Sequence, residues 1–385
     1  MAARVKSAPS KALQEFQEVS NTLVNPETEN WIKRGGKVVG YLCSAMPSEI
    51  ITAAGLLPFR IRATGSKGTE LSDAYFSNIN CSFPRHCFNM ALLGKYDFLE
   101  GVVCMNSCDH VRRIYDNWKR SVKSSFLEIL GLPRKTEPPQ VEWFQGEIVN
   151  LRKRMETHFG VKITDERLWK AIKLHNETRR LQRKLYELRK KKNPPITGAE
   201  TLAVMVAGTA MPRKRYNELL QGLLDEISHS KKGKSDYRAR LMITGGILDD
   251  PAFVRVIEDA GGLVVADSLC FGSRSMWNHV SEGKGDPLSA LARYYLLDRP
   301  SCPRLFGEQT TRSRFVMDMV REFKVDGVIG ERLMFCDQWL VEHFMQGEDF
   351  KEAGIPFLEM DREYTLSGVG QLRTRVQAFL ETMGR

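Results

Sequence analysis

The sequence predicts an α/β protein with two lobes, each built on a parallel β-sheet. The first observation is that short apolar runs alternate with segments of helical periodicity. The second is that this alternation occurs twice, on either side of a stretch with helical periodicity alone. The third is that several of the short runs are apolar throughout, as expected where helices cover both faces of a sheet. Each lobe is therefore expected to be Rossmann-like or flavodoxin-like, with right-handed crossovers.

The first lobe is expected over residues 1–145 and includes an N-terminal helix. Its strands are predicted at Val38–Leu42, Leu57–Ile61, Leu99–Cys104 and Val141–Phe144. Its helices are predicted at Pro47–Ala54, Cys87–Leu93 and His110–Ile129.

A helical insert is expected over residues 146–235, because this stretch lacks strand-like runs up to about Lys231. Helical periodicity is clearest at Leu168–Leu188 and Tyr216–Ile227, and the Pro194-Pro195 pair interrupts it once.

The second lobe is expected over residues 236–385. Its strands are predicted at Leu241–Thr244, Leu263–Ala266, Val325–Ile329 and Ile355–Leu358. Its helices are predicted at Pro251–Asp259, Leu288–Leu297, Ser313–Phe323, Asp337–Met345 and Gly370–Thr382.

The net charge of +10 is concentrated in one run, in which eight basic residues between Arg179 and Lys192 accompany a single acid, Glu187. In helical phase three leucines form an apolar stripe, so the basic residues are expected on a solvated helix face. The alternative is a docking surface for an acidic partner or for CoA phosphates. No zinc-finger spacing or aromatic RNA-binding motif accompanies the run, so a nucleic-acid partner is not expected.

No apolar stretch approaches the roughly 18 residues that a membrane helix needs. The N-terminus has a basic start but no apolar core behind it, so it does not resemble a secretory signal. A cytoplasmic protein without a membrane partner is expected.

Eight cysteines in such a chain are expected to be reduced, as core residues, metal ligands or catalytic thiols. No CxxC pair occurs, which argues against a zinc ribbon, a thioredoxin-like site and a ferredoxin-type cluster loop. Any metal site must therefore gather its ligands from distant segments. P-loop, GxGxxG, GxSxG and HExxH motifs are also absent from the sequence.

The two lobes share a motif that carries a thiol. LEGVVCMNSCDHVRRIYDNW contains Cys108-Asp109 and VDGVIGERLMFCDQWLVEHF contains Cys336-Asp337, each between an apolar strand and a helix. Ligands of open α/β sheets bind at this edge, and a helix N-terminus favours the thiolate that binds metal. The aspartates fit as N-cap residues. The two thiols are therefore expected to face each other across a cleft between the lobes.

A third thiol lies in a loop ahead of a helix, where Cys81 and Cys87 both qualify. Pro84 is expected to keep the segment around Cys81 non-helical, which favours Cys81. Three soft thiolates without CxxC spacing suit an iron–sulfur cluster better than zinc, and leave one iron with an exchangeable site.

The other cysteines have simpler interpretations. Cys43 and Cys104 end apolar strands and are expected in the core, whereas Cys270 and Cys302 are the substitutes if one of the three ligands fails. His86 and His110 lie near the proposed ligands and are expected either to hydrogen-bond around them or to have surface or capping roles.

At these residues the chain resembles the 2-hydroxyacyl-CoA dehydratase and benzoyl-CoA reductase family (2-hydroxyglutaryl-CoA dehydratase D-component type). In length and wording it is most similar to the smaller of the cluster-bearing chains, the C subunits, of ATP-dependent benzoyl-CoA reductases. The matching stretches span nearly the whole chain outside the insert: PSEIITAAGLLPFRI, NCSFPRHCF, NSCDHVRR, LMITGGILDDPAFVRVIEDAGGLVVADSLCFGSR, KVDGVIGERLMFCDQW and GQLRTRVQAFLE.

The resemblance implies a 4Fe–4S cluster in the cleft between the lobes, with Cys81, Cys108 and Cys336 as ligands and a non-cysteine fourth ligand. It also implies a homologous partner subunit with a second cluster, ATP-hydrolysing activator subunits and ferredoxin as the electron donor, so that ATP is used by partners and not by this chain. Glu49 falls where the family has an acidic residue near the active site, which implies proton transfer. A glutamate favoured by the helix dipole is the simpler interpretation.

The expected reaction is reduction of benzoyl-CoA to cyclohexa-1,5-diene-1-carbonyl-CoA by single-electron steps, in which the thioester carbonyl stabilises the added electron as a ketyl. The first alternative is a 2-hydroxyacyl-CoA dehydratase subunit, in which the same chemistry expels hydroxide. The second is a non-catalytic electron-transfer or structural subunit of such a complex. A third, a zinc-binding or cluster-free nucleic-acid protein, rests on the basic run alone.

Overall fold

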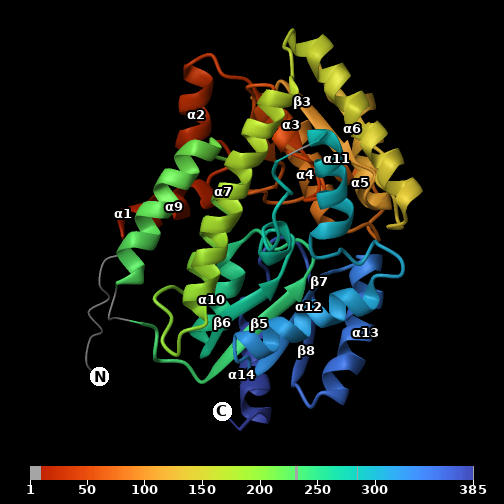
Figure 1. The fold of residues 1–385 in the computed structure, drawn as a ribbon. Coiled ribbons are helices and arrows are strands. Elements are labelled where there is room, and N and C mark those ends of the chain that lie inside the picture. Colours follow the sequence, from red (N-terminus) through yellow and green to blue (C-terminus); the bar gives the residue numbers. More distant parts are fainter. Residues whose placement is uncertain (1–9, 230–232, 284, 385) are drawn as a thin grey trace.

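The computed structural model describes residues 10–229, 233–283 and 285–384, so the basic segment 1–9 and Lys231 lie outside the described residues. The chain forms two parallel sheets of four strands each, with strand orders β2-β1-β3-β4 and β6-β5-β7-β8. Figure 1 shows the first lobe above the second, with helices packed around both sheets. The two orders are the same topology repeated, which confirms the predicted α/β fold with two parallel-sheet lobes.

The first sheet contains β1 (Val38–Tyr41), β2 (Leu57–Arg60), β3 (Gly101–Met105) and β4 (Leu127–Leu130). The helices between these strands are α3 (Glu49–Ala53), α4 (Ser82–Leu92) and α5 (Asp109–Ser121), with a 3₁₀ turn, η1 (Ser72–Ala74), ahead of α4.

The strand predicted at Val141–Phe144 is wrong, because these residues lie in α6 (Pro138–Phe159). The apolar residues continue at helical spacing along one buried face, through Phe144, Ile148 and Leu151. The fourth strand is instead β4, which was predicted as the end of a helix. Only Leu130 of β4 is buried, as is common for an edge strand, so its sequence pattern is weak.

The helix predicted at Cys87–Leu93 begins earlier, at Ser82, as α4. Pro84 therefore does not keep the segment after Cys81 out of a helix. The first four N–H groups of a helix have no partner within it, so a proline in the first turn loses no hydrogen bond. The consequence is that Cys81 is the N-cap residue of α4.

The second sheet contains β5 (Ala239–Gly245), β6 (Gly262–Ser268), β7 (Gly327–Leu333) and β8 (Phe357–Arg362). Its helices are α10 (Pro251–Asp259), α11 (Pro287–Arg293), α12 (Gln309–Glu322), α13 (Asp337–Glu352) and α14 (Val369–Thr382), with a 3₁₀ turn η2 (Ser273–Ser275) and a π-helical turn η3 (Tyr294–Asp298). Every strand predicted in this lobe is present, with bounds that differ by a few residues.

The predicted insert contains α6, α7 (Asp165–Arg189), α8 (Gly198–Ala207) and α9 (Arg213–Ser228). The N-terminal helices are α1 (Lys11–Asn21) and α2 (Pro26–Lys33), and α1 packs against α8 and α9. Helix α7 contacts α3 of the first lobe and β6 of the second, and it runs past both lobes in Figure 1. The predicted boundaries at residues 145 and 235 stay predictions.

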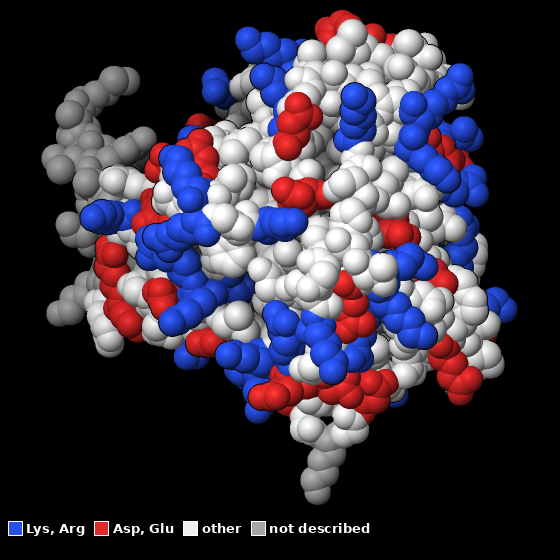
Figure 2. Space-filling view, turned by 90° about the horizontal axis from the view of Figure 1, so that it is seen from above, with Lys and Arg blue, Asp and Glu red and all other residues white. Residues whose placement is uncertain are grey.

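The basic run is only partly the solvated helix face that was expected. Four of its eight basic residues are exposed, namely Arg180, Lys184, Lys191 and Lys192, but the other four are buried or half-buried. Arg179 and Arg189 are buried, and Arg183 stacks on Trp277 at 3.3 Å from the ring centroid. Lys190 pairs with Glu322 of α12 at 2.7 Å. Charge alone places a basic residue on the surface, but each of these side chains finds a partner on another element. On the face shown in Figure 2, Lys and Arg side chains lie among Asp and Glu side chains.

None of the helices in the described part of the chain has the length and apolar character that a membrane span requires.

Candidate metal centre

The three predicted ligands share one position, because each is the N-cap residue of a helix. Cys81 precedes α4, Cys108 precedes α5 and Cys336 precedes α13. The backbone N–H of Val111 donates to Cys108 Sγ at 3.4 Å. Unpaired N–H groups and the helix dipole at this position favour a negatively charged sulfur.

The aspartates after Cys108 and Cys336 were expected to be the N-caps, and this prediction is wrong. Asp109 and Asp337 are the first residues of α5 and α13. Asp109 pairs with Arg112 and Arg113 on the same helix, where its negative charge still suits the first turn. The cap position is thereby left to the thiol.

The strand order explains why these helix starts meet. Cys108 follows β3 and Cys336 follows β7, and each of these strands lies beside the first strand of its own sheet. This is the topological switch point, where crossovers leave on opposite faces and open a crevice at the carboxyl ends of the strands. Cys81 enters from the crossover that follows β2.

The three thiols lie in one apolar cluster with Phe83, Val111 and Leu333. Cys81 is 6% exposed, and Cys108 and Cys336 are half-buried against the same cluster. Burial raises the pKa of Cys336 to about 12, and the neighbouring charge of Cys108 adds to the rise. Burial also raises the pKa of Cys81, with contributions from Cys336 and Cys108. For both thiols burial is the larger cause, because all three cysteines pack against the same apolar cluster.

Tyr364 of the second lobe connects to α4, the helix that follows Cys81. Its backbone N–H donates to Ser82 Oγ at 2.9 Å, and its hydroxyl donates to Asp249 Oδ2 at 2.7 Å. The N–H of Ala63, in the first lobe, donates to the same hydroxyl at 2.9 Å. Hydrogen bonds between the two lobes therefore surround the place where Cys81, Cys108 and Cys336 come together, which we call the cysteine junction.

Two further thiols approach this junction. Cys43 and Cys302 both add to the rise in the pKa of Cys108, after burial. Cys43 was expected in the core, but it is half-buried at the end of β1 with a φ of 81°, a left-handed conformation that a non-glycine residue rarely adopts. No residue pattern in the sequence signals that turn.

The remaining cysteines lie elsewhere. Cys87 and Cys104 are fully buried, and burial raises the pKa of both thiols. Cys270 donates to the carbonyl of Gly246 at 3.2 Å and accepts from Arg60 of the first lobe at 3.1 Å. The Cys270 thiol therefore takes part in hydrogen bonds that connect the two lobes.

Among the described residues, no three His, Cys, Asp or Glu side chains are grouped closely enough to hold one metal ion. A cube of four irons is wider than a single ion, so its ligands stand farther apart than those of zinc. The donor set consists of three soft thiols at helix N-termini in apolar surroundings. These residues therefore fit an iron–sulfur cluster in their chemistry.

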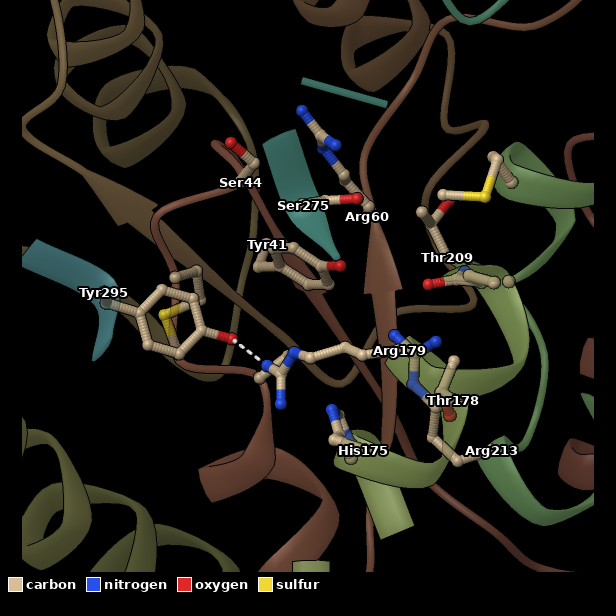
Figure 3. A pocket seen from close by; sticks show the side chains of 15 residues that line it. Tyr41, Ser44, Arg60, His175, Thr178, Arg179, Thr209, Arg213, Ser275 and Tyr295 are labelled. Atoms are coloured by element: carbon tan, nitrogen blue, oxygen red, sulfur yellow. Dashed lines mark hydrogen bonds between the residues drawn. The ribbon is translucent and has the colours of Figure 1, made fainter. Parts of the chain in front are cut away.

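A polar cavity of about 60 Å³ lies between the lobes. Tyr41 and Arg60 of the first sheet, His175 and Arg179 of α7 and Tyr295 of the second lobe line it, as Figure 3 shows. A water needs roughly 10–15 Å³ of such space, whereas ligand pockets span about 300–1,000 Å³. The cavity has room for a few waters and not for an acyl group.

Glu49 lies beside this cavity as the first residue of α3 and is fully buried. Its carboxylate accepts from Arg179 at 2.5 Å and from the Tyr295 hydroxyl at 2.8 Å. Burial is the largest single effect and raises the pKa of Glu49, but Arg179, together with His175 and a backbone hydrogen bond, lowers the pKa to about 2. Burial lowers the pKa of the adjacent His175 to about 3, so at neutral pH the ring is neutral and Arg179 is the counter-ion.

A second buried carboxylate was missed in the sequence. Glu331 of β7 is fully buried, accepts from Arg362 through Oε2 at 2.7 Å, and has no partner at Oε1. Burial raises the pKa of Glu331 to about 7, although Arg362 opposes the rise. A charged residue directly after the apolar run VIG was the available signal, but the predicted strand stopped at Ile329.

Comparison with known proteins gives a consistent result. Residues 43–383 match the family model described as 2-hydroxyglutaryl-CoA dehydratase, D-component. The chain is 29% identical to the (R)-phenyllactyl-CoA dehydratase beta subunit of Clostridium sporogenes, over 96% of this chain and 98% of the relative. It is 27% identical to the C subunit of benzoyl-CoA reductase from Thauera aromatica, over 90% and 91% of the two chains.

It is also 26% identical to the beta subunit of (R)-2-hydroxyglutaryl-CoA dehydratase from Acidaminococcus fermentans, over 98% of this chain and the whole of the relative. These matches confirm the resemblance stated from the sequence motifs. The chain belongs to the 2-hydroxyglutaryl-CoA dehydratase D-component family.

Proposed function

We propose that this chain is the iron–sulfur subunit of a cytoplasmic acyl-CoA enzyme, and that Cys81, Cys108 and Cys336 hold its 4Fe–4S cluster with a non-cysteine fourth ligand. The observation that carries the proposal is the convergence of three helix N-caps, all of them thiols, in one apolar cluster between two sheets. Such a cluster, when bound, supplies single electrons at low potential.

The protein's own residues would do three things at this site. The helix N-termini would place N–H groups and positive dipole ends toward the thiolates, which favours their negative charge. The apolar cluster around Phe83 and Leu333 would exclude water. The hydrogen bonds between lobes through Tyr364 would hold the junction closed.

For the reaction, we propose reduction of benzoyl-CoA to cyclohexa-1,5-diene-1-carbonyl-CoA. The similarity to the C subunit of a benzoyl-CoA reductase supports it. Electrons would come from ferredoxin through ATP-hydrolysing activator subunits, as the family resemblance implies. The absence of a P-loop motif from the sequence is compatible with this division of labour.

Dehydration of a 2-hydroxyacyl-CoA is the second candidate reaction. Its support is that two dehydratase beta subunits match a larger share of this chain than the reductase subunit does. Anoxic assays of the assembled enzyme with benzoyl-CoA, and with a 2-hydroxyacyl-CoA such as phenyllactyl-CoA, separate the two. Cyclic diene formation supports the first, and loss of water to an enoyl-CoA supports the second.

A non-catalytic electron-transfer role is favoured by the size of the cavity. The space beside Glu49 is about 60 Å³, so an acyl group does not fit into this cavity as the structure describes it. Iron that is present in this chain, together with acyl-CoA binding only when the partner is added, would support this role.

We further propose that the exposed face of α13 is covered by a homologous partner subunit. Leu340, Val341 and Phe344 are 55%, 63% and 67% exposed on the helix that Cys336 caps. Apolar side chains gathered on one helix face are typical of a subunit interface. The similarity to named subunits of multi-subunit enzymes supports such a contact.

The proton-transfer role of Glu49 stays a prediction. A carboxyl with a pKa of about 2 is ionised at neutral pH, which favours its role as the anchor of Arg179. Glu49→Gln distinguishes the roles. If Glu49 transfers protons, turnover is lost while iron content and substrate affinity stay at wild-type levels. If it is an anchor, folding stability falls as well.

A further inference from the structure

The two Cys-Asp motifs hold each other by reciprocal hydrogen bonds. Gln338, two residues after Cys336, donates through Nε2 to the carbonyl of Ser107 at 3.1 Å. His110, two residues after Cys108, donates through Nε2 to the carbonyl of Phe335 at 3.1 Å. In each bond the donor is the second residue after one cysteine, and the acceptor is the residue before the other.

This reciprocity follows from the repeated topology. Cys108 and Cys336 follow the third strand of their respective sheets, and the two sheets have the same strand order. Loops at equivalent positions in two similar lobes meet as in a two-fold interface, where each side offers the other the same contact. The equivalent donors are a histidine in one lobe and a glutamine in the other, and both present an N–H at the end of a planar group.

His110 also reaches the third loop. Its Nδ1 lies 2.9 Å from Asn80 Oδ1, and Asn80 directly precedes Cys81. The Asn80 amide is itself held, since Nδ2 donates to the carbonyl of Ser77 at 3.1 Å. The imidazole of His110, two residues after Cys108, therefore contacts the two residues that directly precede Cys81 and Cys336.

The backbone at the acceptor is held in an uncommon conformation. Phe335 has a φ of 64°, in the left-handed region that bulky residues adopt only when their surroundings hold them there. The hydrogen bond from His110 to its carbonyl is one such contact. Phe335 connects that carbonyl directly to Cys336, so the bond fixes where the ligand loop turns.

We propose that His110 and Gln338 are positioning residues that set the separation of Cys108 and Cys336 across the two lobes, and that His110 also fixes Cys81. This inference rests on the proposed function, because the positions matter only if the thiols share one cluster. A cluster held by cysteines of two lobes requires the two cysteine loops to keep their spacing. The hydrogen bonds of His110 and Gln338, together called the clamp, each run from one lobe to the other. Partners that orient ligands in this way typically contribute 10- to 100-fold to metal affinity.

The test compares anoxically reconstituted wild type with His110→Ala, Gln338→Ala, the double variant and His110→Gln. The readouts are iron and sulfide per chain, the EPR spectrum of the reduced cluster, and the rate of iron release to a chelator. His229→Ala, an exposed histidine on the surface after α9, is the matched control. Denaturant unfolding of each cluster-free variant separates loss of positioning from loss of folding.

We expect His110→Ala to speed iron release about 10-fold or more and to shift the EPR spectrum, and Gln338→Ala to have a smaller effect. His110→Gln should restore most of the behaviour, because glutamine performs the equivalent task at position 338. Wild-type release rates and spectra in both alanine variants would overturn the proposal. A spectrum that changes only in variants with lost folding stability would also overturn it.

A second readout keeps the clamp testable if the wild type binds no iron. In the cluster-free chain, a short thiol-to-thiol cross-linker such as dibromobimane should join Cys108 to Cys336, with a lower yield in His110→Ala and Gln338→Ala. Absence of iron in wild type contradicts the proposed function. An unchanged cross-linking yield in His110→Ala and Gln338→Ala contradicts the proposal that these two residues position the thiols.

Discussion

Replacing Arg179 by methionine should be one of the most destabilising single changes in the chain. The substitution keeps the apolar stem of the side chain but removes the guanidinium that pairs with Glu49 at 2.5 Å. Glu49 is fully buried, so its carboxylate would be left with the Tyr295 hydroxyl at 2.8 Å and a neutral His175. An uncompensated buried charge has no solvent to replace its partner.

Two estimates give a similar magnitude. Lowering the pKa of Glu49 from 4.5 to about 2 corresponds to roughly 3 kcal/mol, at about 1.36 kcal/mol per pKa unit. Removing one partner of a buried ion pair typically costs about 3–5 kcal/mol. We therefore expect Arg179→Met to lower the free energy of unfolding by about 3–5 kcal/mol.

The direction of the pH dependence gives a sharper test. In the wild type the pKa of Glu49 is lower folded than unfolded, so its stabilisation is present above pH 4.5 and is lost as the pH falls toward about 2. Without Arg179, burial would raise the pKa above 4.5. The variant should then lose stability as the pH rises above 4.5, whereas the contribution of Glu49 in the wild type is constant over that range.

The assay is urea unfolding of the cluster-free chain in reducing buffer, followed by circular dichroism at pH 5 and pH 8. Arg180→Met is the matched control on the same helix, because Arg180 and its partner Glu282 are 52% and 28% exposed and such a pair contributes at most about 1 kcal/mol. The double variant Arg179→Met with Glu49→Gln should recover much of the loss. A loss below about 1 kcal/mol in Arg179→Met, or an unchanged slope with pH, would refute the reasoning.

Three further outcomes are expected. Glu331 has a pKa of about 7 in the folded chain, so the native state keeps the Glu331 proton to a higher pH than the unfolded state does. The free energy of unfolding should therefore fall by roughly 3 kcal/mol from pH 4.5 to above pH 7. Glu331→Gln should remove this fall in urea unfolding, and the same pH dependence in the variant as in wild type would contradict the prediction. Cys336→Ala should lose most of the bound iron in anoxic iron analysis, whereas Cys104→Ala, in the core, should keep it; equal iron in both would contradict the ligand assignment. Phe344→Asp, on the exposed face of α13, should weaken assembly with the partner subunit in size-exclusion chromatography without lowering the stability of the isolated chain, and unchanged assembly would exclude this face from the interface.

The elements that the sequence predicted well are those whose signal is local. The apolar strands of the second sheet are continuous runs, and the shared Cys-Asp motif placed Cys108 and Cys336 at equivalent helix starts. The strand expected at Val141–Phe144 failed because four apolar-rich residues fit a strand or one turn of a helix equally well. The cap positions failed because aspartate is the commoner N-cap, and at Cys108 the thiol accepts the hydrogen bond instead.

The rest of the site depends on residues far apart in the chain. Arg179 was expected on a solvated face, and only packing against α3, 130 residues earlier, turns it into a buried counter-ion. The bonds of His110 and Gln338 span 225 and 231 residues. Such partners have no signature in a single sequence, because each side chain alone is compatible with the surface.

Helix α7 also determines how the molecule can move. It contacts α3 in the upper lobe, and farther along it Arg189 donates to the carbonyl of Val264 in the lower sheet. It acts as a strut across the crevice, so a wide hinge opening would have to break several buried polar bonds at once. A shear of one sheet past the other would preserve more of these contacts than a hinge opening. Admission of a bulky reactant to the crevice should then be slow and coupled to the state of this one helix.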